Sequence, residues 1–198
     1  MARTIAKDHD EKRGQILKTA AKVFADEGYD RASMSKLATA CGISKANIYH
    51  YYDSKDALLF DILDTYLRAL RDRICGIDTD GLSPQECLRA TVSEILLAYQ
   101  GADDEHRVQS SGIAVLPADQ QSMLRGFQRD LVDYLSDTVA SIAPDVFEND
   151  KAKLHGVTMS IFGMLNWFYM WNSKAGPDAR EEYAELVSNL SLHGIRGL

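Results

Sequence analysis

Apolar residues recur at steps of three and four along most of the chain, and this spacing constrains the fold more than any other feature. Ile16, Ala20, Val23 and Phe24 form one such stripe, which ends before Gly28. A helix turns once every 3.6 residues, so this spacing gives each segment one apolar face. No segment alternates apolar and polar residues for long enough to predict a strand. The sequence therefore predicts an all-α protein.

Glycine, proline and polar clusters divide this helical pattern. They fall at residues 76–82, 100–104, 116–117, 144–150 and 174–177. The segment 105–116 has the weakest pattern, and we predict that it is helical. The sequence SPQE at residues 83–86 has the composition of a capping box, with proline in the first turn. Asp53 is predicted to open a long helix that ends near residue 75.

The chain of 198 residues is 45% hydrophobic, which suffices for the core of one large domain or two small ones. Its net charge of −7 is unevenly distributed. Residues 1–56 contain ten basic and eight acidic residues, whereas the remainder contains twelve and twenty-one. A head of charge +2 on a body of charge −9 indicates that the head meets an anionic partner.

Two short helices joined by a glycine turn are predicted in this basic head. The first covers residues 34–41, with Ser33 as its N-cap, and Gly42 makes the turn. Ser44 then caps a second helix that is barely two turns long, with Ile48 facing inward. Packed under a longer first helix, this arrangement is a helix-turn-helix.

The side chains left outside on the second short helix have the chemistry that the DNA major groove requires, namely small residues for close approach and polar tips for base edges. Ala46 fits a thymine methyl group, Asn47 pairs with adenine or a phosphate, and Lys45 reaches guanine or a phosphate. Lys55 lies at the start of the next helix, where a phosphate is favoured. Tyr52 is interpreted as a packing residue beneath that helix. The predicted DNA-binding residues are Ser33, Ser35, Ser44, Lys45, Ala46, Asn47, Tyr49, His50, Tyr51 and Lys55.

The stretch from Arg13 to Leu59 resembles the DNA-binding domain of TetR-family transcriptional repressors. Its matching residues are ILKTAAKVFADEGYDRASMSKLATACGISKANIYHYYDSKDALL. The family pattern closes its first helix with FAE-x-GY and places Y-x-YF-x-SK after the turn; Tyr52 replaces the usual phenylalanine. The resemblance implies about nine helices in two domains. These are a DNA-binding domain at residues 10–56 and an effector-binding and dimerisation domain at 57–198, linked by a helix at about 54–75.

The resemblance also implies a homodimer that reads the two half-sites of a near-palindromic double-stranded DNA operator. The last two helices, at about 154–171 and 178–197, are expected to form the dimer bundle. Gly156, Gly163 and Gly194 would allow close helix approach there. A small effector bound in the second domain is expected to release the DNA, and repression is the usual mode of the family.

The segment FGMLNWFYMW, residues 162–171, resembles a helix in TetR-type regulators of fatty-acid and aromatic-acid degradation, and the N-terminal region resembles repressors of phenylacetate catabolism. This likeness implies an acyl- or aryl-CoA effector such as phenylacetyl-CoA. An aromatic stripe can line a cavity, but it can equally pack the core, and Met164 and Trp171 can instead face a partner subunit. Arg107, Arg125, Arg129 and Lys174 are candidates for the CoA phosphates, or solvated surface charges. The predicted pocket residues are Tyr99, Met123, Phe127, Asn166, Trp167, Phe168 and Trp171.

Fewer residues support other functions for this chain. The chain has no GxSxG or HExxH motif and no phosphate-cradling glycine loop, so we predict no catalytic activity, cofactor or metal site. Three widely spaced cysteines argue against a disulfide framework and fit a reducing cytoplasm. The apolar run 156–171 is too short to span a membrane. The alternative is a regulator of the same fold that responds to a different hydrophobic ligand, or to none.

Overall fold

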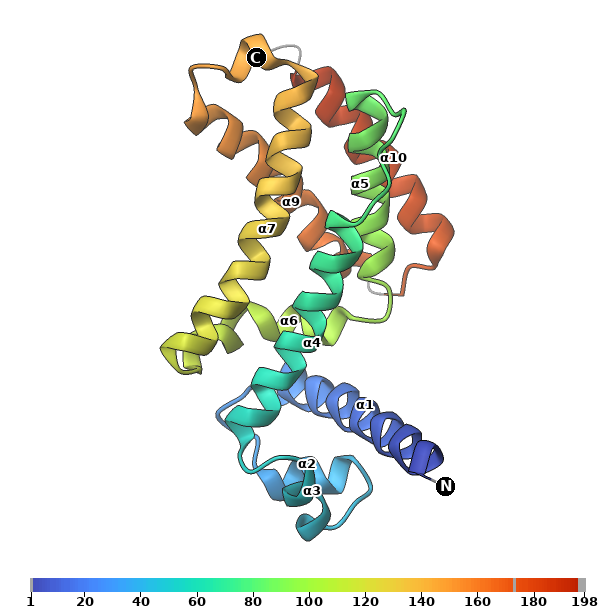
Figure 1. Cartoon of the computed structure of the whole chain (residues 1–198), viewed down its shortest axis with the longest axis vertical. Coiled ribbons are helices and arrows are strands. Elements are labelled where there is room, and N and C mark those ends of the chain that lie inside the picture. The colour runs from blue at the N-terminus through green and yellow to red at the C-terminus, as the bar shows by residue number, and fades with distance from the viewer. Residues whose placement is uncertain (1, 173, 196–198) are drawn as a thin grey trace. The chain divides into compact units, whose positions relative to one another are not determined.

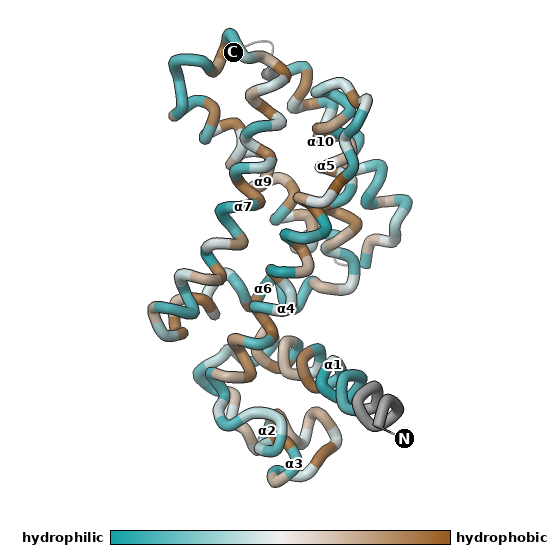
Figure 2. The backbone as a smooth tube through the Cα atoms, viewed as in Figure 1, coloured by the Kyte–Doolittle hydropathy of each residue, from teal (hydrophilic) through white to brown (hydrophobic). Residues whose placement is uncertain are grey.

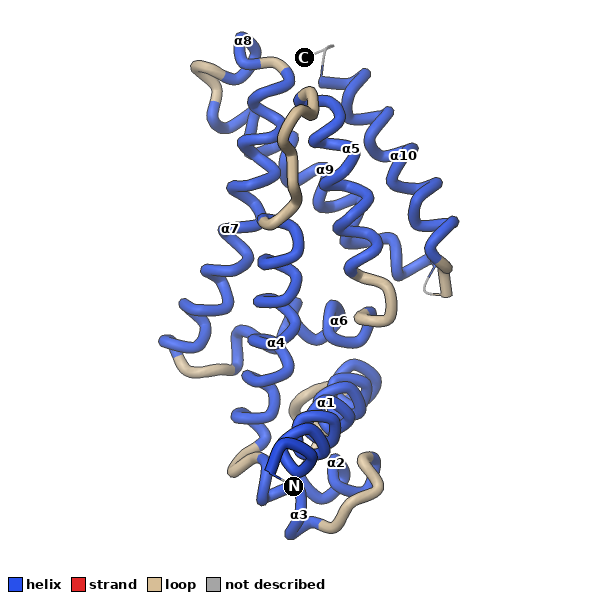
Figure 3. Tube along the Cα trace, turned by 45° about the vertical axis from the view of Figure 1, so that its right-hand side comes forward, coloured by secondary structure: helices blue, strands red, loops and turns tan. Residues whose placement is uncertain are grey.

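The computed structural model describes residues 2–172 and 174–195, which fold into helices joined by loops, with no strand (Figures 1 and 3). The prediction of an all-α protein is confirmed, with ten α-helices and one 3-10 helix in this described part where about nine helices were expected. The elements are α1 (Ala2–Glu27), α2 (Met34–Ala40), α3 (Lys45–Tyr51), α4 (Lys55–Cys75), α5 (Pro84–Ala98), α6 (Asp103–Gly112), η1 (Ile113–Val115), α7 (Ala118–Ile142), α8 (Pro144–Phe147), α9 (Lys151–Asn172) and α10 (Pro177–Ile195).

Two compact units divide the chain. One combines Met1–Leu67 with Asp104–Leu124, and the other combines Arg68–Asp103 with Arg125–Leu198. Helices α4 and α7 therefore each contribute residues to both units. These two units are groups of residues that pack together. The boundary expected between residues 56 and 57 instead separates two functions, so the two divisions of the chain differ. That boundary stays a prediction.

In the first unit, α1, α2 and α3 each bury one face. Ile16 and Ala20 of α1, Leu37 of α2 and Ile48 of α3 have at most 1% of their surface exposed. Hydrophilic and hydrophobic residues are mixed along these helices (Figure 2), because each has a buried and a solvated side. The core of this unit therefore holds α2 and α3 in place and leaves their other faces outside.

In the second unit, α5 and α10 lie side by side (Figures 1 and 3). Between them, Arg180 of α10 is 1% exposed, and the sequence pattern gave no sign of its burial. Its Nε donates to the carbonyl of Ala175 at 3.2 Å and its Nη1 to the carbonyl of Leu96 at 3.1 Å. Because the last carbonyls of a helix lack partners within it, Arg180 completes the hydrogen bonding at the end of α5.

Some predicted boundaries need correction. Asp53 was expected to open α4, but Ser54 does so: its Oγ accepts a hydrogen bond from the backbone N–H of Ala57 at 3.0 Å. Aspartate and serine both favour N-cap positions, so the residue types alone do not separate them. The segment 105–116 is helical as predicted, with α6 ending at Gly112 and the 3-10 helix η1 continuing to Val115. The expected break at 144–150 contains the short helix α8.

The predicted capping box at the start of α5 is confirmed. The Ser83 hydroxyl accepts a hydrogen bond from the backbone N–H of Glu86 at 3.3 Å, and the Glu86 carboxylate accepts one from the Ser83 N–H at 2.8 Å. The Ser83 hydroxyl also donates to the Glu86 carboxylate at 2.6 Å, and this bond, together with the one from the Ser83 N–H, lowers the pKa of Glu86. The resulting stabilisation is present above the ordinary glutamate pKa and is lost as the pH falls through the lowered value.

Ser83→Ala is expected to lower the free energy of unfolding by about 1 kcal/mol, because it removes the acceptor for the orphan N–H of the first turn of α5. Urea unfolding followed by circular dichroism measures this change. Ser122→Ala, an exposed serine inside α7, serves as the control. Equal stabilities for the Ser83→Ala protein and its parent would contradict the assignment of the cap.

Candidate DNA-binding site

Helices α2 and α3 are joined by a tight turn and capped by the two predicted serines. The Ser33 hydroxyl accepts a hydrogen bond from the N–H of Lys36 at 3.3 Å, and the Ser44 hydroxyl accepts one from the N–H of Asn47 at 3.1 Å. Gly42 between them has a φ of 65°, in the left-handed region that favours glycine. This local chemistry fixes where α3 begins and in which direction it runs.

One face of α3 is buried and the other is open to solvent. Ile48 has no exposed surface, as predicted. The side chains of the other face carry a cation, an amide, a phenol, an imidazole and a methyl group. The exposed residues are Lys45, Ala46, Asn47, Tyr49 and His50. Such a face has both the polar tips and the small residue that allow a helix to enter a major groove.

The remaining predicted DNA-binding residues lie around this face. Ser35 is exposed at the start of α2, whereas the hydroxyls of Ser33 and Ser44 already act as helix caps. Tyr51, at the end of α3, stacks on His9 of α1, with ring centres 4.9 Å apart and planes at 22°. His9 therefore joins the surroundings of α3, a role that sequence analysis missed because the two residues are distant in the chain.

The Lys55 ammonium is held by the loop that follows α1. Its Nζ donates to the carbonyls of Tyr29 at 2.9 Å and Ala32 at 3.3 Å, and it lies 4.0 Å from the centre of the Tyr29 ring. The Tyr29 hydroxyl in turn donates to the Asp56 carboxylate. An ammonium group has three donors, so these two bonds leave Lys55 one N–H for a phosphate. Its DNA contact stays a prediction.

Tyr52, the C-cap residue that directly follows α3, is held by a residue of α4. Tyr52 is 7% exposed, which agrees with its interpretation as a packing residue. Its hydroxyl donates to Oδ2 of Asp61 on α4 at 2.6 Å, and Asp61 also accepts from Arg13 of α1. Burial raises the pKa of Tyr52, with a further contribution from Asp61, so the hydroxyl stays a donor.

The predicted effector residues are only partly brought together. In the second unit, the Tyr99 hydroxyl donates to Oδ1 of Asn166 at 2.7 Å, and burial raises the pKa of Tyr99. Phe168 is 1% exposed and stacks on Tyr183, with ring centres 4.6 Å apart. Trp167 and Trp171, in contrast, are 62% and 59% exposed. These two tryptophans therefore lie on the surface of the isolated chain.

The other predicted effector residues and cations occupy varied surroundings. Phe127 is buried, with the Arg68 and Arg71 guanidinium groups 4.9 and 5.1 Å from its ring centre. Met123 is 48% exposed and belongs to the first unit. Arg107 donates to the carbonyl of Ala25 and to Asp26 within that unit. Arg125, Arg129 and Lys174 are exposed.

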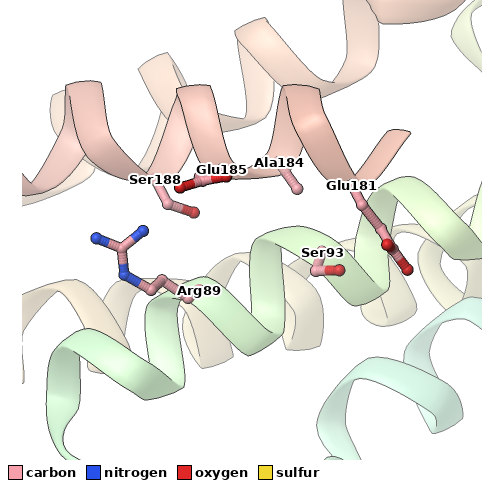
Figure 4. A pocket seen from close by; sticks show the side chains of 6 residues that line it. All are labelled: Arg89, Ser93, Glu181, Ala184, Glu185 and Ser188. Carbon is pink, nitrogen blue, oxygen red and sulfur yellow. The ribbon is translucent and has the colours of Figure 1, made fainter. Parts of the chain in front are cut away.

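A polar cleft of about 420 Å³ lies between α5 and α10 (Figure 4). Glu181 and Ser93 lie at one end, and Arg89 and Ser188 at the other. Arg89 Nη2 donates to Asn189 Oδ1 at 2.7 Å. None of the predicted effector residues lines the cleft, and its two glutamates outnumber its single arginine. This charge balance disfavours the phosphates of a CoA ester, so the effector is not expected here.

Helices α9 and α10 expose most of the large apolar side chains that reach solvent. Among the residues whose side chains the structure describes, ten large apolar ones are exposed, and the six on these two helices are Met159, Trp167, Met170, Trp171, Leu186 and Leu190. A groove of about 510 Å³ between the two helices is lined by Gly156, Ile161, Met164 and Leu190, among others. An apolar groove between two helices that expose large apolar side chains is typical of an interaction site.

The part of the chain that the structure describes offers neither a metal site nor a membrane-spanning helix. Within it, no three histidine, cysteine, aspartate or glutamate side chains cluster in a way that could hold a metal ion. None of the helices described has the length and apolar composition needed to cross a membrane.

The chain matches two family models. The model of bacterial regulatory proteins of the tetR family covers residues 16–62, and that of the tetracyclin repressor-like C-terminal domain covers residues 81–195. Two curated Bacillus subtilis regulators match 40% and 42% of the chain, and the chain spans only 27% and 29% of their length. The transcriptional repressor NicS of Pseudomonas putida is 24% identical over 96% of the chain and 95% of NicS.

Solved structures extend the likeness to nearly the whole chain. A TetR-family transcriptional regulator from Bordetella parapertussis is 35% identical, with a TM-score of 0.83, over 94% of this chain and 96% of that one. AibR in complex with isovaleryl coenzyme A and operator DNA is 25% identical, with a TM-score of 0.74, over 90% of this chain and 97% of AibR. One family model covers more than half of the chain, and the Bordetella regulator aligns over almost all of it. The chain therefore belongs to the TetR family of bacterial regulatory proteins.

Proposed function

We propose that this TetR-family transcriptional regulator is a repressor that binds a near-palindromic operator as a homodimer and is released by a CoA ester, an acyl- or aryl-CoA such as phenylacetyl-CoA. The observation that carries the DNA-binding part is the exposed face of α3. Its five polar or small side chains stand outside a capped helix-turn-helix whose apolar side is buried.

Each exposed residue of α3 has a role in this proposal. Asn47 reads adenine through its amide, Lys45 contacts guanine or a phosphate, and Ala46 lies against a thymine methyl group. Tyr49 and His50 contact the sugar-phosphate wall, which orients the protein without reading sequence. The positive balance of residues 1–56 supports this contact, because the rest of the chain is acidic and would repel DNA.

The dimer is proposed to form through α9 and α10, expected at about 154–171 and 178–197; residues 196 and 197 lie outside the described part. The exposed methionine, leucine and tryptophan side chains of these helices support this interface, since a second copy would bury them. Gly156 and Gly194 line the groove between the helices and permit close approach. Under this proposal Trp167 and Trp171 face the partner subunit rather than the effector.

The effector is proposed to be a CoA ester because AibR, which is similar over most of both chains, has been solved in complex with isovaleryl coenzyme A and operator DNA. The hydrogen bond between buried Tyr99 and part-buried Asn166 offers polar groups of the kind that orient a ligand in a binding site. Arg125, Arg129 and Lys174 are exposed cations suited to the CoA phosphates. The second candidate function is a regulator that responds to a different hydrophobic ligand or to none. It is favoured by the exposure of Trp167 and Trp171, because these two predicted pocket residues do not line an interior cavity.

Fluorescence anisotropy of a labelled duplex from upstream of the protein's own gene tests the proposal. Phenylacetyl-CoA, medium- and long-chain acyl-CoAs and the free acids are added to the preformed complex. We expect one CoA ester to release the DNA and its free acid to leave the complex intact, because the acid lacks the phosphates. A complex that no ligand disturbs would remove the effector from the proposal. If the protein binds neither this duplex nor any duplex from a genome-wide selection, the whole proposal is overturned.

A further inference from the structure

Three helices of the first unit meet at one carboxylate. Asp61 of α4 accepts hydrogen bonds at Oδ2 from the Tyr52 hydroxyl at 2.6 Å and from Arg13 Nε at 3.0 Å. Its Oδ1 accepts a bond from Arg13 Nη2 and lies 3.4 Å from the Thr65 hydroxyl. Arg13 belongs to α1, and Tyr52 directly follows α3. The carboxylate thus joins the end of α3 to both of the helices that support it.

This cluster is partly buried, and burial strengthens its hydrogen bonds. The Asp61 side chain is 20% exposed, and the whole of Tyr52 is 7% exposed. Hydrogen bonds to a charged group are stronger than neutral ones, and water competes less with them at a half-buried site. The hydrogen bond and the charge of Asp61 raise the pKa of Arg13, so the guanidinium keeps its positive charge beside this carboxylate.

Tyr52 transmits this anchoring to α3. Its backbone N–H donates to the Ile48 carbonyl at 3.0 Å and so closes the last turn of the helix. Its backbone then turns to an extended conformation, with φ of −143° and ψ of 121°. A side chain fixed at this point restricts how α3 can tilt or rotate on the core below it. The helix has only seven residues, so one anchor at its end acts on its whole length.

We propose that Asp61 is a positioning residue for operator recognition: through the Tyr52 hydroxyl it holds α3 at the angle that brings Lys45 and Asn47 to the base edges. The inference rests on the proposed DNA contact of α3. Base readout by bidentate hydrogen bonds requires accurate placement, whereas phosphate contacts tolerate small rotations. Loosening the anchor therefore lowers the affinity for the operator more than the affinity for unrelated DNA.

Tyr52→Phe and Asp61→Ala, alone and together, test this inference in the full chain. Tyr52→Phe removes only the hydroxyl, and phenylalanine is the residue that the family pattern usually carries there. Each single change is expected to lower operator affinity about tenfold, the size of one hydrogen bond to a charged group. In the Tyr52→Phe background, Asp61→Ala is expected to have a much smaller effect on operator affinity, because the bond to Tyr52 is already missing and only the bonds to Arg13 are lost.

The decisive readout is the ratio of operator affinity to the affinity for unrelated DNA, measured by anisotropy at one salt concentration. Asp137→Ala, at an exposed carboxylate of α7, is the matched control and should leave the ratio unchanged. Thermal melts confirm that each variant is folded at the assay temperature. Asp61→Glu, which keeps the charge but displaces it, is expected to restore the ratio in part.

Two outcomes would overturn the inference: an unchanged ratio in folded Asp61→Ala protein, or additive effects of Tyr52→Phe and Asp61→Ala. The first would mean that the cluster only stabilises the fold, and the second that Asp61 does not act through Tyr52. Failure of the parent protein to bind any operator would instead contradict the proposed function. The parent measurement therefore separates the two failures.

Discussion

Leu186→Asp and Leu190→Asp are expected to convert the protein to a monomer and to lower its operator affinity by about a hundredfold or more. Both leucines lie on α10 one helical turn apart, and they are 52% and 57% exposed in the single chain. An aspartate there is solvated in the monomer but buried without a partner in the proposed dimer, which costs several kcal/mol. A monomer also loses the gain that comes from binding two half-sites at once.

Sedimentation velocity and operator anisotropy measure the two effects on the same samples. Leu82→Asp is the matched control, because Leu82 is a 40% exposed leucine in the loop before α5. It receives the same change in charge and polarity outside α9 and α10, so it should remain dimeric and bind the operator normally. Dimeric Leu186→Asp and Leu190→Asp proteins would show that the subunits associate through another surface.

Interactions within one turn of a helix were predictable from the sequence. The caps at Ser33, Ser44 and Ser83 each join a side chain to a backbone N–H three residues later, and all three are observed. Such bonds depend on residue type and spacing, although these did not separate Ser54 from Asp53 at the start of α4. The same reasoning placed Ile48 in the core and Lys45 outside, because a short helix has only one buried side.

Contacts between distant segments were not predictable in this way. Arg13 and Asp61 are 48 residues apart, and Arg180 and Leu96 are 84 apart. Each pairs a common surface residue type with a partner that only the packing of helices brings near. Arg180 is the clearest case, since arginine is almost never fully buried unless it is paired. No local pattern distinguishes it from the exposed arginines elsewhere in the chain.

The aromatic residues of α9 show a related ambiguity. Trp167, Phe168 and Trp171 lie within an arc of about 100° around a helix, so helical spacing alone does not tell which of them faces the interior. In the structure Phe168 is buried and the two tryptophans are exposed. A stripe that contacts a partner subunit has the same composition as one that lines a cavity, since both exclude water. Only the packing of the folded chain separates the buried Phe168 from the exposed Trp167 and Trp171.

Asn47→Ala and Tyr49→Ala are expected to weaken DNA binding in different ways. An amide that reads adenine contributes about 2 kcal/mol of discrimination, so Asn47→Ala should lower operator affinity about thirtyfold and leave binding to unrelated DNA almost unchanged. Tyr49 is 43% exposed on the same helix, and its proposed partner is the sugar-phosphate wall. Tyr49→Ala should therefore weaken binding to all duplexes by a similar factor.

Titrations of the operator, of operators changed one base pair at a time and of unrelated DNA, all at one salt concentration, distinguish these two patterns. For Asn47→Ala the penalty for changing one adenine position should disappear, because the side chain that enforced it is gone. Asn149→Ala, at an exposed asparagine in the loop before α9, should match the parent on every duplex. If both α3 variants bind the operator as tightly as the parent, α3 is not the recognition helix. The DNA would then have to meet a surface other than the exposed face that α2, its glycine turn and Ile48 hold in place.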